Sequence, residues 1–395
     1  MLVSFHINPD GALSDSEVGE LGPVVDKIKS FASSKKQNDD VSLKQAVAEY
    51  LFINGESLSD EQKKFAPSLV RFLEIPNGCS WDGVSARLAD SGAGNGRDAF
   101  VKSGYSDVLK QELDGSKYPV KENVLTGKVV TKVKTLEDGS IEVTTDDNSI
   151  YISEFAIITI PQGVLKISGS DDETISKETG AIKFEPSLPQ NILDGFKKTH
   201  MTSLSKVIFE FDKSFWPDVE KFIVLPKPDE SLNSTKEPNF NTQEHNKPPA
   251  SNAQLDPFDY PYLIANLQSL RNIPALMVLA PAPTTHLLET KGEQFAWAFL
   301  KPIIAKISNL KTDELPKGPK VTITTSWTSD AFSRGSISGN APGDNLVNAG
   351  LIEGVGNLRF AGEAYCYEGH GNAHGAYLSG LKEAEFVAGK LSHKL

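Results

Sequence analysis

The stretch RFAGEAYCYEGHGNAHGAYLSGLKEAE, residues 359–385, carries the strongest fold signal in the chain. It has the pattern of a buried strand end, a loop broken by glycines and a helix from about Ala373. Ala376, Gly380 and Ala384 recur every four residues, which predicts one stripe of small side chains that Gly375 and Ser379 widen. The free N–H groups at the helix start favour a ligand that gains negative charge. Close packing of helix on sheet, without a ligand, explains the pattern equally well.

The composition is that of an ordinary soluble globular chain. Its 395 residues carry 40 basic and 52 acidic side chains, a formal net charge of −12. This negative charge argues against nucleic acid and anionic membranes as partners. No apolar run has the length of a membrane-spanning helix, and the N-terminus lacks the pattern of a signal peptide. The chain length favours two domains.

The cysteines and histidines do not indicate a metal site. Cys79 and Cys366 are far apart in sequence, and Gly371 between His370 and His374 disfavours a shared helix face for that pair. Two cysteines suit a reducing compartment, so we expect a cytoplasmic protein. The final tripeptide HKL, residues 393–395, is close to the S-K-L address and leaves a peroxisomal location open.

The N-terminal part of the chain has helical periodicity. Apolar residues recur at helical spacing over 16–34, and Ser42 and Ser59 precede further amphipathic segments as expected N-caps. Residues 225–257 are rich in proline, asparagine, serine and charge, which indicates a flexible surface insertion.

From about residue 124 the pattern changes to strands. Asp138 and Gly139 predict a two-residue hairpin turn between two β-rich runs. The apolar run 156–160 is typical of a buried central strand. Residues 204–216 indicate another strand, on which Val207, Phe209 and Phe211 share one face.

The opening stretch resembles the C-terminal flavin-binding segment of the flavin-containing amine oxidases. Within that family it is most similar to polyamine oxidases, histone-demethylase-type enzymes and fungal corticosteroid-binding proteins. Four further segments resemble the family in the same order: GRDAFVKSGYSDVL (96–109), FAIITIPQGVLK (155–166), LSKVIFEFDKSFW (204–216) and TTSWTSDAFSRGSIS (324–338).

The resemblance implies an α/β (α+β) fold, in which an FAD-binding Rossmann-like domain is interleaved with a substrate domain of mixed sheet and helices. The expected segments are substrate-domain helices (1–95), an FAD-domain segment with a β-meander (96–165), the substrate domain (166–325) and the C-terminal FAD-binding segment (326–395). The family's first strand and G-x-G-x-x-G turn have no clear counterpart, because SGAGNGRD (91–98) follows no strand. We therefore expect an incomplete FAD domain in this sequence.

The resemblance implies FAD as cofactor and assigns residues around it. Lys206 matches the lysine that holds a water near the flavin N5 atom. Val129 matches the hairpin position whose backbone meets the adenine. Trp327 matches the tryptophan beside the flavin.

The opening stretch supplies the other matches. Glu363, directly after Gly362, matches the glutamate near the ribose and phosphates. Gly375 and Ala376 match the helix start under the flavin pyrimidine edge. Two positions depart from the family: Ile337 and Asn372 stand where relatives have aromatic side chains, which weakens an aromatic wall that attracts amines.

The function implied by the resemblance is FAD-dependent oxidation of amines, with polyamines such as spermine as expected substrates. A hydride passes to flavin N5, the imine hydrolyses, and O2 reoxidises the flavin to give H2O2. Two alternatives stay open. The chain could be a binding protein for an apolar ligand such as a steroid, or a truncated inactive product.

Overall fold

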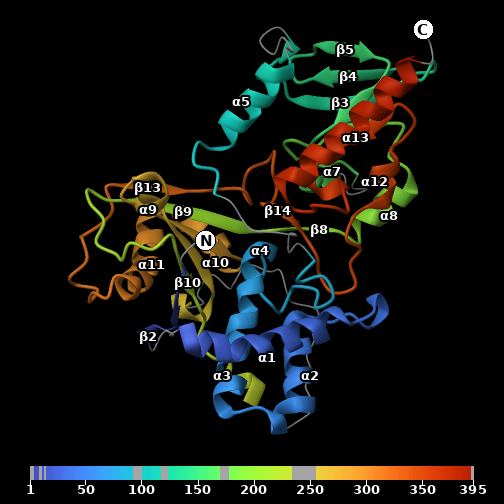
Figure 1. Cartoon of the computed structure of the whole chain (residues 1–395). Coiled ribbons are helices and arrows are strands. Elements are labelled where there is room, and N and C mark those ends of the chain that lie inside the picture. The colour runs from blue at the N-terminus through green and yellow to red at the C-terminus, as the bar shows by residue number, and fades with distance from the viewer. Residues whose placement is uncertain are drawn as a thin grey trace.

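The computed structural model describes residues 4–8, 11–12, 15–91, 100–116, 123–169, 178–233 and 255–392. Buried apolar side chains form three clusters: one in the N-terminal helices, one on a large sheet and one in a lobe built from residues 133–196 and 351–365. Figure 1 shows how these parts of the fold are arranged. Helices and mixed sheets alternate along the chain, as the expected α/β class requires.

The N-terminal helices begin where the caps predicted. Ser42 accepts the N–H of Gln45, and Ser59 forms a reciprocal capping box with Gln62. Val24, Ile28 and their neighbours on α1 are buried against α2 and α3. The helices are α1 (Asp15–Ser33), α2 (Leu43–Asn54), α3 (Asp60–Val70) and α4 (Glu74–Asn77).

A seven-stranded sheet forms the centre of the second cluster. Its order is β13-β9-β12-β11-β10-β1-β2, and β1 with β10 is its one parallel pair in the described part of the chain. The strands are β1 (Ser4–Asn8), β2 (Gly11–Ala12), β9 (Leu204–Glu210), β10 (Lys221–Val224), β11 (Tyr262–Asn266), β12 (Ala275–Pro281) and β13 (Val321–Thr324).

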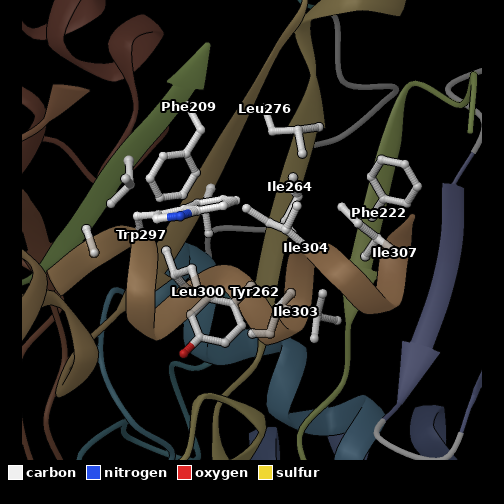
Figure 2. Close-up of a cluster of buried hydrophobic side chains, with 14 of the residues drawn as sticks. Phe209, Phe222, Tyr262, Ile264, Leu276, Trp297, Leu300, Ile303, Ile304 and Ile307 are labelled. Atoms are coloured by element: carbon white, nitrogen blue, oxygen red, sulfur yellow. The ribbon is translucent and has the colours of Figure 1, made fainter. Parts of the chain in front are cut away.

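Helix α11 (Glu293–Ile307) packs its apolar face on this sheet. Figure 2 shows Trp297 and Leu300 of the helix facing Phe209 and Leu276 of the strands. The predicted face of β9 is confirmed, because Val207 and Phe209 are completely buried and Phe211 is nearly so. Two shorter helices lie in the same part of the chain, α9 (Leu267–Arg271) and α10 (Thr284–Lys291).

The third lobe contains a four-stranded sheet of order β5-β4-β3-β7. The predicted hairpin joins β3 and β4, but its turn has three residues, because Leu136 and Ser140 still pair and Gly139 takes φ +84°. Three-residue loops use a left-handed residue at this position, so the dipeptide identified the turn but not its length. The strands are β3 (Val130–Thr135), β4 (Ile141–Thr145), β5 (Ile150–Ser153) and β7 (Lys183–Glu185).

The predicted central strand differs from the expectation. β6 (Ala156–Ile158) pairs with one described strand, the parallel β15 (Leu358–Phe360), and Ile157 is 38% exposed. β8 (His200–Thr202) and β14 (Ile337–Gly339) form a second short pair. Further described helices are α5 (Tyr105–Ser116), α7 (Gln162–Ser168), α8 (Gln190–Phe196), α12 (Ala349–Glu353) and the 3-10 turn η7 (Glu363–Tyr365).

Helix α13 (Ala373–Ser392) begins at the predicted residue and buries one side of the predicted small-residue stripe. Its buried residues are Gly375, Ser379 and Glu383, whereas Ala384 is exposed and Gly380 has no neighbour within contact distance of an added Cβ. The prediction is confirmed for Gly375 and Ser379 and is wrong for Gly380 and Ala384. An ion pair explains which side is buried, because the buried Arg359 of β15 reaches Glu383 at 2.6 Å.

Two further expectations fall partly outside the described residues. Within the predicted insertion 225–257, Leu225 is buried and Glu230–Asn233 forms a 3-10 turn, while 234–254 lie outside the described residues. Almost all of the loop predicted at 91–98 also lies outside them. A search of the described helices finds none with the length and apolarity to cross a membrane.

Candidate active site

A cavity of about 350 Å³ lies where the ends of β6 and β8 meet the C-terminal segment. Four of the residues assigned by resemblance line it, namely Trp327, Gly362, Glu363 and Ala376. They come from the segment after β13, the turn after β15 and the first turn of α13. The cavity is within the size range of small-molecule sites, so the fold assembles one candidate site from the predicted residues.

The backbone of Gly362 is clamped beside this cavity. Ser379 Oγ lies 2.9 Å from the amide nitrogen of Gly362 and 3.1 Å from its carbonyl oxygen. Gly362 has φ +153°, a backbone conformation that favours glycine. Tyr365 extends the clamp by donating its buried hydroxyl to the carbonyl of Ile160 at the end of β6.

The start of α13 approaches the preceding loop very closely. A Cβ on Gly375 would lie 2.2 Å from the carbonyl oxygen of Gly369 and 2.8 Å from Cys366 Sγ, so the position requires glycine. Within the described part of the chain, the backbone N–H groups of Ala373, His374 and Gly375 have no hydrogen-bond partner. These unpaired N–H groups at the N-terminus of a long helix can donate hydrogen bonds to an electron-rich group of a ligand.

Glu363 is tied to the strand β14 and to a histidine. Its carboxylate accepts the Ser338 N–H at 3.1 Å and the Ser338 hydroxyl in a shorter contact, and Ser338 Oγ lies 3.1 Å from His370 Nε2. Burial raises the pKa of Glu363, against the lowering by both hydrogen bonds from Ser338. Burial also lowers the pKa of His370 to about 4, so its imidazole is neutral at pH 7.

Trp327 is 44% exposed at the cavity wall, and its backbone N–H donates to the Glu289 carboxylate at 3.1 Å. Lys206 lies near the start of β9 with its side chain exposed and outside the cavity lining. Its backbone N–H donates to the Thr325 hydroxyl at 2.9 Å, two residues before Trp327. Lys206 is therefore hydrogen-bonded to the turn that carries Trp327, but it does not line the cavity.

Besides Lys206, four predicted residues lie outside the cavity lining, namely Val129, Ile337, Asn372 and Gly375. Val129 lies before β3, and both its backbone groups bond to Asp146. Ile337 is half-buried in β14, next to Ser338, and Asn372 is exposed just before α13. The adenine contact of Val129 and the substrate-facing roles of Ile337 and Asn372 stay predictions.

A second, more polar cavity of about 250 Å³ adjoins the first, and Met201 and Gly335 line both. His286 and Thr328 contribute to its wall, and burial lowers the pKa of His286. The guanidinium of Arg334, also at this wall, donates to Glu178 at 2.6 Å. Among the described residues, no group of three His, Cys, Asp or Glu side chains could hold a metal ion.

Comparison with known proteins identifies the family. The profile of flavin containing amine oxidoreductases matches residues 25–388. The chain belongs to this family. A corticosteroid-binding protein of Candida albicans is 30% identical, with 98% of this chain and 81% of that protein aligned. Lysine-specific histone demethylase 1 homolog 3 of Oryza sativa subsp. indica is 27% identical, over 95% of this chain and 42% of its own length.

Solved structures confirm the amine oxidase fold. Cyclohexylamine oxidase from Brevibacterium oxydans superimposes with a TM-score of 0.66, covering 98% of this chain and 81% of that structure at 15% identity. FAD is the family's cofactor. The residues present fit its flavin ring, because the cavity has a matching size, an aromatic wall at Trp327 and the unpaired N–H groups at the start of α13 beside Ala376.

Sequence reasoning placed Ser379 in the small-residue stripe of α13 through its helical spacing from Gly375, but did not assign its contacts with Gly362. It missed two other residues that support this site, Ser338 and Glu289. Ser338 directly follows Ile337, whose predicted role is to face the substrate, and lies on the opposite face of the strand. Glu289 has no local signal, because its partners at 325–328 lie 36 or more residues away.

Proposed function

We propose that this member of the family oxidises polyamines such as spermine, consuming O2 and water and releasing H2O2. The observation that carries the proposal is the convergence of Trp327, Gly362, Glu363 and Ala376 on one cavity. Polyamine oxidase 2 of Arabidopsis thaliana, 27% identical over 73% of this chain and 49% of its own length, supports the choice of substrate class.

FAD, when bound, accepts the hydride from the carbon beside the amine nitrogen. The residues of the chain itself bind the cofactor and orient the substrate. Glu363 accepts hydrogen bonds from cofactor hydroxyls, and the N–H groups at the start of α13 stabilise negative charge at the flavin edge. Trp327 packs along one side, and Lys206 holds a water beside the reacting atoms. These roles are carried over from the family and are part of the proposal.

The charge of the chain suits a cationic substrate. A net charge of −12 raises the local concentration of polyamine cations around the protein. The reacting nitrogen must give up its proton before hydride transfer, because an ammonium group withdraws electrons from the adjacent C–H bond. We therefore expect turnover to rise with pH as the bound amine is deprotonated.

The experiment combines FAD binding with H2O2 release. The purified chain is titrated with FAD, freed of excess by gel filtration and assayed with spermine. Lys206→Met is expected to keep the flavin absorbance and to lower turnover by about 100-fold. Lys213→Met changes an exposed lysine just past the end of the same strand and is the matched control. A yellow protein that releases no H2O2 with spermine contradicts the proposed substrate.

A second candidate is steroid binding without turnover. It is favoured by the similarity to the corticosteroid-binding protein and by the apolar side chains of Ile160, Pro161 and Ala364 in the wall of the larger cavity. A largely apolar wall suits a flat apolar ligand. Equilibrium dialysis with cortisol distinguishes the two functions, because saturable binding that spermine does not displace, with no H2O2 released, supports the binding protein.

A further inference from the structure

The side chain of Glu289 accepts hydrogen bonds from several residues of a single turn, 325–328. Glu289 lies on α10, and its Oε1 accepts the backbone N–H of Trp327 at 3.1 Å. Its Oε2 accepts the N–H of Thr328 at 3.0 Å and, in a shorter contact, the Thr328 hydroxyl. The Thr325 hydroxyl lies 3.4 Å from Oε1. Hydrogen bonds to a carboxylate are stronger than neutral ones, so this side chain is a firm anchor for residues 325–328.

The same turn is joined to the strand that carries Lys206. The Thr325 hydroxyl accepts the Lys206 N–H at 2.9 Å, and the Lys206 carbonyl accepts the Thr325 N–H at 3.1 Å. The Ser205 hydroxyl, 3.3 Å from that of Thr325, adds a third contact. Glu289 is therefore connected through one threonine to Lys206, and directly to Trp327.

The anchored turn also lies between the two cavities. Trp327 lines the larger cavity, and the next residue, Thr328, lines the smaller one. Glu289 lines neither, so it has no direct contact with a ligand in either cavity. A shift of this turn would move the walls of both cavities together.

We propose that Glu289 is a positioning residue of the flavin site, which fixes the turn 325–328 so that Trp327 stays at the cavity wall and Lys206 stays in register beside it. This inference rests on the proposed function for the roles of Trp327 and Lys206. Glu289 acts through Trp327 and Lys206, because its carboxylate contacts the turn 325–328 and lines neither cavity.

Acrylamide quenching of tryptophan fluorescence tests the inference without any flavin. Trp327 is 44% exposed, whereas Trp81, Trp216 and Trp297 are at most 9% exposed, so acrylamide reaches mainly Trp327. Trp327→Phe identifies its share of the signal. The variants compared are Glu289→Ala and Glu289→Gln, with Glu293→Ala as the matched control on an exposed site of the adjacent helix.

Glu289→Ala is expected to raise the quenching constant of the Trp327 component about twofold and to weaken FAD binding about tenfold. Glu289→Gln keeps one acceptor oxygen for the Trp327 backbone N–H. Its quenching constant and FAD affinity should therefore lie between those of Glu289→Ala and those of the parent protein. Glu293→Ala should match the parent in both measurements. With spermine, Glu289→Ala should lower kcat more than it changes KM, because a displaced wall misorients the bound amine.

The inference is overturned if Glu289→Ala and Glu293→Ala give the same quenching and the same FAD affinity. It is also overturned if Trp327 becomes more accessible while FAD affinity and turnover stay at parent values. Should Glu289→Ala fail to fold, Glu289→Gln decides in the same way. If the parent chain binds FAD but does not oxidise spermine, the proposed function is wrong. The quenching constant and the FAD affinity of the variants then still test the positioning role of Glu289.

Discussion

The Glu363 carboxylate accepts both donors of Ser338, the backbone N–H at 3.1 Å and the side-chain hydroxyl. This pair joins the strand β14 to the turn that follows β15, and it fixes the one carboxylate in the wall of the larger cavity. His370 lies behind Ser338, with its Nε2 3.1 Å from the hydroxyl. Burial shifts the pKa values of Glu363 and His370 in opposite directions.

Glu363→Gln should make the protein relatively more stable as the pH rises. Burial raises the pKa of Glu363 in the folded protein, so the folded state binds the proton more tightly than the unfolded chain. That stability is present below pH 4.5, the ordinary pKa, and is lost as the pH rises through the raised pKa. Thermal unfolding between pH 4.5 and pH 7 measures it. The advantage of the glutamine variant should grow across this range, and Glu368→Gln, an exposed neighbour, should show no such trend.

His370→Gln should flatten the acid side of the stability curve. The pKa of His370 is lowered from 6.5 to about 4, so the unfolded chain takes up a proton before the folded one does. The stability is present above pH 6.5 and is lost as the pH falls to about 4, by up to about 3 kcal/mol. Urea unfolding at pH 4, 5, 6 and 7 measures it. His374→Gln, at the exposed start of α13, is the control, and equal slopes for both variants would contradict this account.

Gly375→Ala and Gly380→Ala should have opposite effects on the same helix. The Gly375 Cβ would meet backbone atoms of Gly369 at 2.2 Å and 2.6 Å, which forces the loop away and should cost about 3 kcal/mol or more. A Cβ on Gly380 has no neighbour within 4 Å, so alanine should stabilise the helix by up to about 1 kcal/mol. Chemical denaturation of both variants measures the difference. A destabilised Gly380→Ala would show that α13 has a partner along that face.

Arg71→Met should be strongly destabilising, because it strips a buried carboxylate of its partner. Arg71 Nε lies 2.6 Å from Glu74 Oε1, with side chains that are 9% and 0% exposed. The expected loss is about 3–5 kcal/mol, and Arg71→Met with Glu74→Leu should recover most of it. Lys63→Met breaks the exposed ion pair to Asp60 and should change stability by less than about 1 kcal/mol. Urea unfolding of the four proteins measures these differences, and a double variant as unstable as the single one contradicts the explanation.

Much of the candidate site was predictable because a few contiguous segments carry it. Trp327, Gly362, Glu363 and Ala376 were assigned from sequence and meet at one cavity. Their supports were not predictable in the same way. Ser338 and Glu289 act across the fold, and the partner of Ser338 lies 25 residues away in sequence.

By itself, the sequence determined what depends on neighbouring residues. The caps at Ser42 and Ser59, the buried face of β9 and the start of α13 follow from side-chain spacing and from hydrogen bonds within one turn. The tertiary structure alone decided which face of α13 is buried. Two adjacent stripes on this helix are composed largely of small residues, one through Gly375 and Ser379 and one through Ala376, Gly380 and Ala384. The buried ion pair from Arg359 to Glu383 selects the first, because a charge in the interior must face its partner.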